Sequence, residues 1–227
     1  KWKQEERRNN ITRREQKNNT PPYLDMKILT ITLYKWDAQH PTILCQGEEL
    51  GFVSIFQRRV VREHVVFRSR TCTSKCSQGE KAAISLDDDL GICYVAVMPS
   101  GLAGAVVTDN EYPEPVAFRL INELFQNFQQ SFSYEDWENL EKDASLNFPL
   151  LGESIKKYQN PVEADKLYKT QKAVEEATEV VHLNLNKLMD RGETLESLMG
   201  KSEDLSTASF DFYKRAKKAN ACCKMGQ

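Results

Sequence analysis

Short runs of apolar residues in the first half of the chain have the pattern of β-strands. Residues 26–34 are rich in β-branched and aromatic side chains, and a second apolar run, 42–45, follows a turn at His40-Pro41. These two runs predict a β-hairpin. Polar and Pro-Gly breaks delimit three further predicted strands, at 81–86, 91–98 and 102–108.

Apolar residues at spacings of three and four predict helices between and after these strands. The first helix is expected from Ser54 to about Ser69, with a stripe of Phe56, Val60, His64 and Phe67. Pro113 marks the start of a second helix, whose buried face consists of Ala117, Ile121, Leu124, Phe125, Phe128 and Phe132. A third, from Tyr134 to about Ala144, carries Trp137 and Leu140. The predicted order is ββαβββαα.

Polar segments flank this predicted domain, which we assign to residues 26–144. Residues 1–25 are rich in Arg, Lys and Asn and contain too few apolar side chains to form a core, so we expect them to be disordered. We further expect the native chain to start at Met26. Residues 145–162, which end at Asn160-Pro161, are interpreted as a linker.

A different helical pattern begins near Glu163. Steps of three and four residues alternate without interruption, which is the spacing of a coiled coil, and we assign residues 163–221 to this motif. The sixteen seam positions are Leu167, Thr170, Val174, Ala177, Val181, Asn184, Leu188, Arg191, Leu195, Leu198, Ser202, Leu205, Ser209, Phe212, Ala216 and Ala219. One helix over 163–219 would be about 80 Å long, too long for an ordinary core helix.

The seam is continuous but weakly apolar, because many of its positions are Thr, Ala, Ser or Asn. Such a helix is expected to stay largely disordered alone and to fold when other strands cover it. Arg191 lies in the middle of the seam, and burying its guanidinium unpaired would cost several kcal/mol. The facing strands must therefore supply acceptors, which predicts assembly with different chains.

On these residues, the C-terminal pattern resembles the R-SNARE family. That family pairs one arginine with three glutamines from three partner helices in a central layer, with seven layers before it and eight after it, as counted here around Arg191. The resemblance implies an R-SNARE that assembles with three Q-SNARE helices into a four-helix bundle and drives vesicle-membrane fusion. Arg191 would form the central layer, and Phe212 a bulky layer near the membrane.

The block Asp109-Asn110-Glu111-Tyr112-Pro113, which leads into Val116-Ala117-Phe118, resembles the longin domain of trafficking proteins. This resemblance implies an α+β, profilin-like fold with a five-stranded, antiparallel-type sheet and helices on both faces. Strand order by itself fits any small α/β domain with five strands. The resemblance also implies a groove at the first helix and the middle strand, where Phe67 would lie, that receives the folded-back SNARE motif and autoinhibits it.

The tail, residues 222–227, resembles that of the lipid-anchored longin R-SNARE, which lacks a transmembrane helix. Adjacent cysteines there carry palmitoyl and prenyl groups, which implies lipidation at Cys222 or Cys223 and a C-terminal membrane anchor. Four residues follow Cys223, one more than a prenylation box has. The resemblance further implies ER to Golgi and other protein transport, with cycling between the cytoplasm and Golgi, ER-derived vesicle, endosomal or vacuolar membranes.

Composition excludes several other classes. The 31 basic and 33 acidic residues give a net charge of −2, which does not indicate nucleic-acid binding, and no run of 18 apolar residues occurs. The six cysteines lack a disulfide framework, and we expect reduced thiols. The scattered histidines indicate no metal site, and we interpret His64 and His182 as exposed or half-buried helix residues.

Two other functional classes are alternatives to an R-SNARE. A thiol enzyme is disfavoured because Cys93 has no nearby base, so we expect neither catalysis, a small-molecule substrate nor a cofactor apart from covalent lipids. A non-fusogenic longin regulatory scaffold in membrane trafficking remains the alternative.

Overall fold

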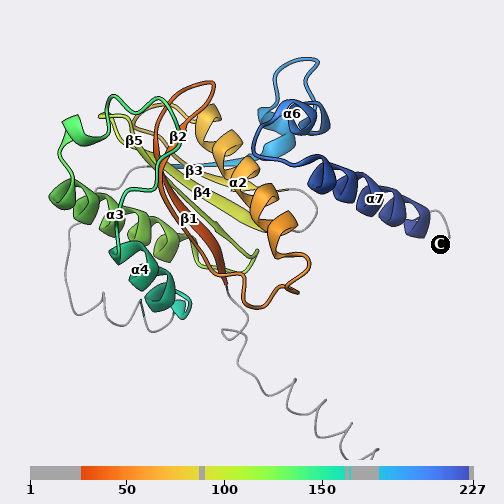
Figure 1. The fold of residues 1–227 in the computed structure, drawn as a ribbon, viewed down its shortest axis with the longest axis horizontal. Helices are drawn as coiled ribbons and strands as arrows, with labels where there is room; N and C mark the ends of the chain where they lie inside the picture. The colour runs from red at the N-terminus through yellow and green to blue at the C-terminus, as the bar shows by residue number, and fades with distance from the viewer. Residues whose placement is uncertain (1–26, 87–89, 162–163, 165–178, 225–227) are drawn as a thin grey trace, which may run out of the picture.

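A central β-sheet with helices on both faces organises the computed structural model (Figure 1), which describes residues 27–86, 90–161, 164 and 179–224. The strands are β1 (Ile28–Lys35), β2 (Thr42–Glu48), β3 (Lys81–Ser85), β4 (Ile92–Val97), β5 (Leu102–Thr108) and β6 (Val180–Asn184). The helices are α2 (Arg58–Lys75), α3 (Glu114–Ser131), α4 (Leu150–Tyr158), α6 (Leu195–Lys201) and α7 (Thr207–Lys224), with short 3-10 turns at η2 (Tyr134–Asp136) and η3 (Leu185–Leu188).

The order of the strands is β2-β1-β5-β4-β3-β6. The first five strands pair antiparallel, and β6 joins β3 in parallel. The five predicted strands are thus confirmed, and the α+β class with them. The sheet has a sixth strand, however, because residues that we assigned to the coiled coil pair with the edge of β3.

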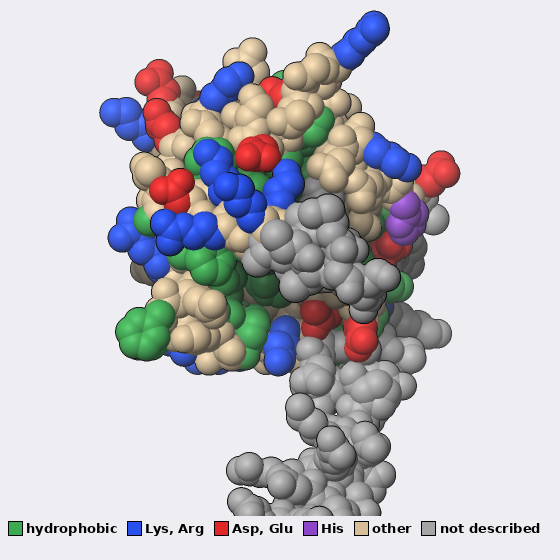
Figure 2. Space-filling view, turned by 90° about the vertical axis from the view of Figure 1, so that its right-hand side faces the viewer, with side chains coloured by type: hydrophobic (Ala, Val, Ile, Leu, Met, Phe, Trp, Pro, Cys, Tyr) green, Lys and Arg blue, Asp and Glu red, His purple; other side chains and the backbone are tan. Residues whose placement is uncertain are grey.

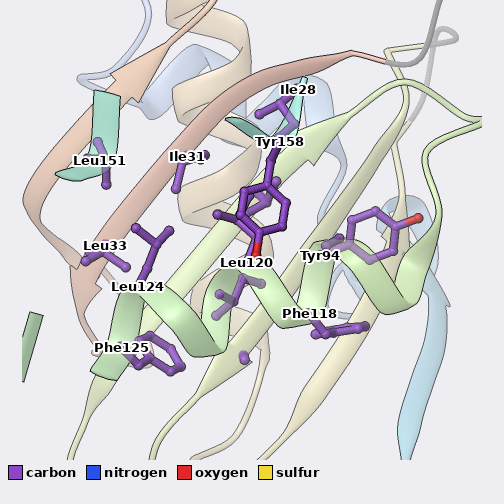
Figure 3. Close-up of a cluster of buried hydrophobic side chains, with 14 of the residues drawn as sticks. Ile28, Ile31, Leu33, Tyr94, Phe118, Leu120, Leu124, Phe125, Leu151 and Tyr158 are labelled. Carbon is purple, nitrogen blue, oxygen red and sulfur yellow. The ribbon is translucent and has the colours of Figure 1, made fainter. Parts of the chain in front are cut away.

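Helices α3 and α4 cover one face of the sheet. Pro113 precedes α3 as predicted, and the side chains of Leu120, Leu124 and Phe125 are buried toward the strands (Figure 3). A Cβ atom at Gly104 of β5 would lie 2.9 Å from Ile121, so glycine there allows α3 to approach the sheet closely.

The segment 145–162 is not only a linker, because it contains α4. Leu151, Ile155 and Tyr158 repeat at helical spacing and are buried in the same cluster as α3. Figure 3 shows Tyr158 and Leu151 among side chains from β1 and α3. The prediction of a helix over 134–144 was wrong. Only η2 is helical there, and the following backbone pairs with β2 instead, through Ala144 N to Ile43 O at 2.7 Å.

Helix α2 covers the opposite face. It begins at Arg58, later than predicted, and Phe56 lies before it with its side chain exposed rather than in the stripe. Phe67 is buried in the second cluster, whereas Val60 is only half buried.

The C-terminal segment does not form one long helix. Within 179–224, the chain makes β6, η3, α6 and α7. Strand β6 pairs with the edge of β3, and α7 contacts α2 before it projects away from the body of the molecule (Figure 1). The break falls at a turn, where Glu193 N donates to Asp190 O and Gly192 has a φ of +89°. The predicted continuous helix is therefore wrong for residues 179–224. These residues instead form shorter elements that pack against the sheet and α2.

Candidate functional site

The contact between the C-terminal segment and the α2 face is the main candidate site. Leu185, Leu195, Met199 and Leu205 are buried in one cluster with α2 and the sheet. Partly buried side chains pack against this cluster from the same segment: Leu183, Leu188, Met189, Leu198, Phe210 and Tyr213. Burial of each large apolar side chain stabilises such a contact by about 1.5–3 kcal/mol. Burial of apolar side chains thus provides most of the free energy that stabilises this contact.

Arg70 connects three parts of the molecule at this contact. Its side chain is 5% exposed, and its Nε and Nη2 atoms donate to the two carboxylate oxygens of Asp204, each at 2.9 Å. Nη1 and Nη2 also donate to Asp143, at 3.0 and 2.6 Å, and Nη1 donates to Pro41 O. Burial disfavours the charged guanidinium, but these acceptors outweigh it and raise the pKa of Arg70.

Glu63 holds the start of α7. Its carboxylate accepts hydrogen bonds from Ser206 N at 2.8 Å and Ser206 Oγ at 2.7 Å, and it pairs with Arg59 on its own helix. Burial would raise the pKa of Glu63, but the hydrogen bonds from Arg59, Ser209 and Ser206 lower it to about 2. The carboxylate therefore remains charged at neutral pH and accepts from the Ser206 amide at the start of the helix.

His64 is buried between α2 and α7, so its predicted exposure was wrong. Its Nε2 lies 3.1 Å from Ser209 O, and its Nδ1 lies 3.1 Å from Nη1 of Arg68. The ring of Tyr213 packs against the imidazole with centroids 5.9 Å apart. His182 is exposed, but it lies on strand β6 rather than on the predicted helix.

Surface ion pairs complete the contact at the far end of α2. Lys75 Nζ lies 2.7 Å from Asp190 and 3.9 Å from Glu193. Because Asp190 is exposed, this pair contributes little to stability. The buried Arg70 pairs and the apolar cluster therefore dominate.

The predicted seam residues fall into three groups in this arrangement. Leu195, Leu205 and Ser209 are buried, and Asn184, Leu188, Leu198 and Ser202 are half buried. Arg191, Val181, Phe212 and Ala216 are exposed. Leu167, Thr170, Val174 and Ala177 lie outside the described residues, and the side chains of Ala219, Cys222 and Cys223 lie outside the described part of α7.

Phe67 lies at the contact between α2 and the C-terminal segment. It is buried, and with Arg70, Leu198 and Asp204 it lines a cavity of about 320 Å³ between α2 and the C-terminal segment. The structure therefore brings Phe67 together with residues that are 130 or so positions away in sequence, such as Leu198.

Three further kinds of feature were expected to be absent: a metal site, a reactive thiol and a membrane-spanning helix. Cys45, Cys72, Cys76 and Cys93 are buried and form no disulfide, and burial raises the pKa of Cys45 to about 12. The described residues contain no group of three or more His, Cys, Asp or Glu side chains suited to a metal ion. Among the described helices, none combines the length and apolarity needed to cross a bilayer.

Comparison with known proteins identifies both halves of the chain. The family model described as Synaptobrevin matches residues 166–225, and the Longin model, described as a Regulated-SNARE-like domain, matches residues 51–155. The VAMP-like protein YKT61 of Arabidopsis thaliana is 36% identical over 87% of this chain and 98% of its own length. The synaptobrevin homologs YKT6 of Debaryomyces hansenii and ykt6 of Schizosaccharomyces pombe are 35% and 31% identical over the same shares.

The chain belongs to the YKT6 family of longin-type R-SNAREs. The resemblance found from the sequence is thereby confirmed for both the longin domain and the SNARE motif. This family acts in vesicle trafficking and is not enzymatic, and SNARE proteins need no cofactor. The contact between α2 and the C-terminal segment is therefore a contact between the longin domain and the SNARE motif of one chain.

Sequence reasoning missed the polar residues that fix this contact. Arg70 and Asp204 are 134 positions apart, and Glu63 and Ser206 are 143 apart, so no local pattern links them. One signal was present: α2 carries Arg68 and Arg70 beside Phe67, and basic residues so close to a buried stripe require nearby acceptors.

Proposed function

We propose that this R-SNARE drives vesicle-membrane docking and fusion by zippering with three Q-SNARE helices around Arg191, and that the longin domain autoinhibits it by holding the SNARE motif closed. One observation carries this proposal. Leu195, Leu205 and Ser209, which are seam positions of the predicted bundle, are buried against α2 and the sheet. The same side chains cannot pack on the longin domain and in a four-helix bundle at once.

The exposed seam positions support the same switch. Arg191 and Phe212 face solvent while the stretch between them is held on α2. The backbone must also change, because β6 and the turn at Gly192 have to become helix before the seam is continuous. The SNARE motif therefore has two alternative states, closed on the longin domain or open. Partner helices bind only the open state and shift the equilibrium toward it.

Met199 separates closure from assembly, because it is buried in the closed form but is not a seam position. We expect Met199→Asp to open the SNARE motif, since a carboxylate in this apolar cluster costs several kcal/mol. Assembly with purified Q-SNARE partners, followed by fluorescence anisotropy, should become at least about tenfold faster. Ser197→Asp adds the same charge at an exposed site of α6 and should match the wild type. Equal rates for all three chains would contradict autoinhibition.

The C-terminal end of α7 is suited to membrane attachment. In Figure 1 it projects away from the body of the molecule, and Lys214, Arg215, Lys217 and Lys218 on it are exposed. One lipid chain holds a protein only marginally, whereas two chains, or one chain with a basic cluster, hold it stably. We assign Cys222 and Cys223 as the lipidated residues, which would let the protein cycle from the cytosol to Golgi, ER-derived vesicle, endosomal or vacuolar membranes.

Intact mass measurement of the chain purified from its own cells tests this assignment. We expect mass added by one or two lipid groups, and we expect the Cys222→Ser/Cys223→Ser variant to lose that mass and to leave the membrane fraction. Cys93→Ser, at a buried thiol, should keep both. An unmodified wild-type mass would reject lipidation at these residues and leave the fusion proposal untouched.

A further inference from the structure

Three large apolar side chains are exposed together on the turn that precedes α2. Phe52 is 49% exposed, Ile55 is 71% exposed and Phe56 is 90% exposed. No other described segment exposes three large apolar side chains within five positions. Neither the closed contact nor the predicted bundle uses this turn. Burying one such side chain is worth about 1.5–3 kcal/mol, so a partner that covered these three side chains would gain binding free energy.

The backbone of this turn is held in place. Arg58 donates from Nε to Val53 O at 3.0 Å and from Nη2 to Gly51 O at 3.1 Å, and Gln57 N donates to Ser54 O at 2.8 Å. Val53 packs against the α2-side cluster. The turn is therefore anchored on one side while Ile55 and Phe56 extend into solvent, which is the arrangement of a preformed tip.

Charged side chains of both signs flank the tip, and Glu49 Oε1 accepts from Gly51 N at its start. Lys27 Nζ lies 4.8 Å from the centre of the Phe52 ring, and Arg59 and Arg62 lie on the first turns of α2 with exposed side chains. Glu63 and Glu48 pair with these two arginines and offset part of their charge.

Elsewhere on the molecule, helix α7 carries four exposed cations, Lys214, Arg215, Lys217 and Lys218, of which Lys217 pairs with Glu196 at 3.0 Å. Helix α7 crosses α2, where Tyr213 packs against His64. Figure 2, which faces the side from which α7 projects, shows Lys and Arg side chains gathered beside exposed hydrophobic ones.

We infer that residues 52–56 insert into the headgroup region of an anionic phospholipid bilayer. A stable protein interface needs about 800 Å² on each partner with complementary shape, far more than a tip of three side chains provides. Insertion into a bilayer surface needs only protruding apolar groups with flanking cations. This contact would bring the longin domain to the membrane surface, and it does not require lipidated cysteines.

Vesicle flotation of the full chain, produced without lipidation, tests this inference. We expect wild type to float with vesicles of phosphatidylcholine and phosphatidylserine and not with phosphatidylcholine alone. Ile55→Ser/Phe56→Ser should lower the partition coefficient at least about tenfold. Tyr134→Ser, which removes an exposed aromatic ring from another segment, should bind as wild type. In Phe56→Trp, tryptophan emission should shift to shorter wavelength only with the anionic vesicles.

Two outcomes would overturn the inference. One is wild type that stays unbound with anionic vesicles, and the other is a double variant that floats as well as wild type. Sedimentation velocity on the same proteins tests whether the tip binds a second copy of the chain instead. If the wild type self-associates, the double variant does not, and both float equally well, the tip is a dimer contact. Because neither assay uses Q-SNARE partners or lipidated protein, both are independent of the proposed fusion activity.

Discussion

Asp204→Asn is expected to release the SNARE motif from the longin domain while the longin domain remains folded. The Asp204 side chain is 12% exposed, and both of its oxygens accept from Arg70. Asparagine keeps the size but removes the charge and turns a donor toward the guanidinium. Arg70 retains Asp143 and Pro41 O, so the domain keeps its own pairing. Loss of one partner at a buried pair should cost about 2 kcal/mol, or about a 30-fold shift toward the open form.

Hydrogen exchange measures this release directly. The amides of β6, which pair with β3 in the closed form, should exchange faster in Asp204→Asn, whereas those of β1 and β5 should not change. Glu203→Gln changes the same charge at the exposed neighbouring position and should behave as wild type. Protection of β6 that equals wild type in Asp204→Asn would show that the Arg70 pair does not hold the motif closed.

Arg70→Ala is a harsher change and separates the two roles of this residue. It leaves the largely buried Asp204 without its guanidinium partner and also removes the link between α2 and Asp143. The pKa of Asp143, which burial raises but Arg70 and the Ile43 amide lower, should then move upward. The longin domain itself should lose stability in this variant, which Asp204→Asn should spare.

The longin fold could be predicted because its signals are local. The apolar, β-branched runs of β1 and β5 and the stripe behind Pro113 in α3 each specify an element within a short window. Helix α4 was missed although Leu151, Ile155 and Tyr158 have helical spacing, because three apolar positions in a short segment are a weak pattern. The predicted start of α2 was too early because the exposed Phe56 has helical spacing with Val60 and fits the predicted stripe.

The closed conformation of the SNARE motif could not be predicted from the heptad pattern, because that pattern describes an assembly rather than the isolated chain. In the proposed bundle, partner helices would cover the seam of the heptad repeat, whereas in the closed form its leucines pack on the longin domain. The β-branched pair Val180-Val181 then fits the free edge of β3. Buried residues outside the seam, Leu185 and Met199, belong to this second arrangement. One sequence thus carries the pattern of both states.

Arg191 should matter only in the assembled state, which makes Arg191→Ala the sharpest test of fusion. Arg191 is exposed in the closed form, at the turn before α6. Its substitution should therefore leave hydrogen exchange of the free chain unchanged. In a four-helix bundle, alanine would leave three glutamines without their donor, at a cost of about 1–3 kcal/mol for each group that stays unsatisfied. Liposome fusion with three Q-SNARE partners should slow by at least about tenfold.

Two matched variants sharpen this comparison. Arg215→Ala removes an exposed arginine from α7 outside the seam and should fuse as wild type. Arg191→Gln supplies an amide in place of the guanidinium and should recover part of the rate, because it can hydrogen-bond with the partner glutamines. A regulatory longin scaffold that binds SNAREs without completing the bundle would support little fusion and would respond alike to all three substitutions. If Arg191→Ala fuses at the wild-type rate, this side chain does not lie in the core of the bundle. A buried arginine then no longer supports assembly with three unlike helices.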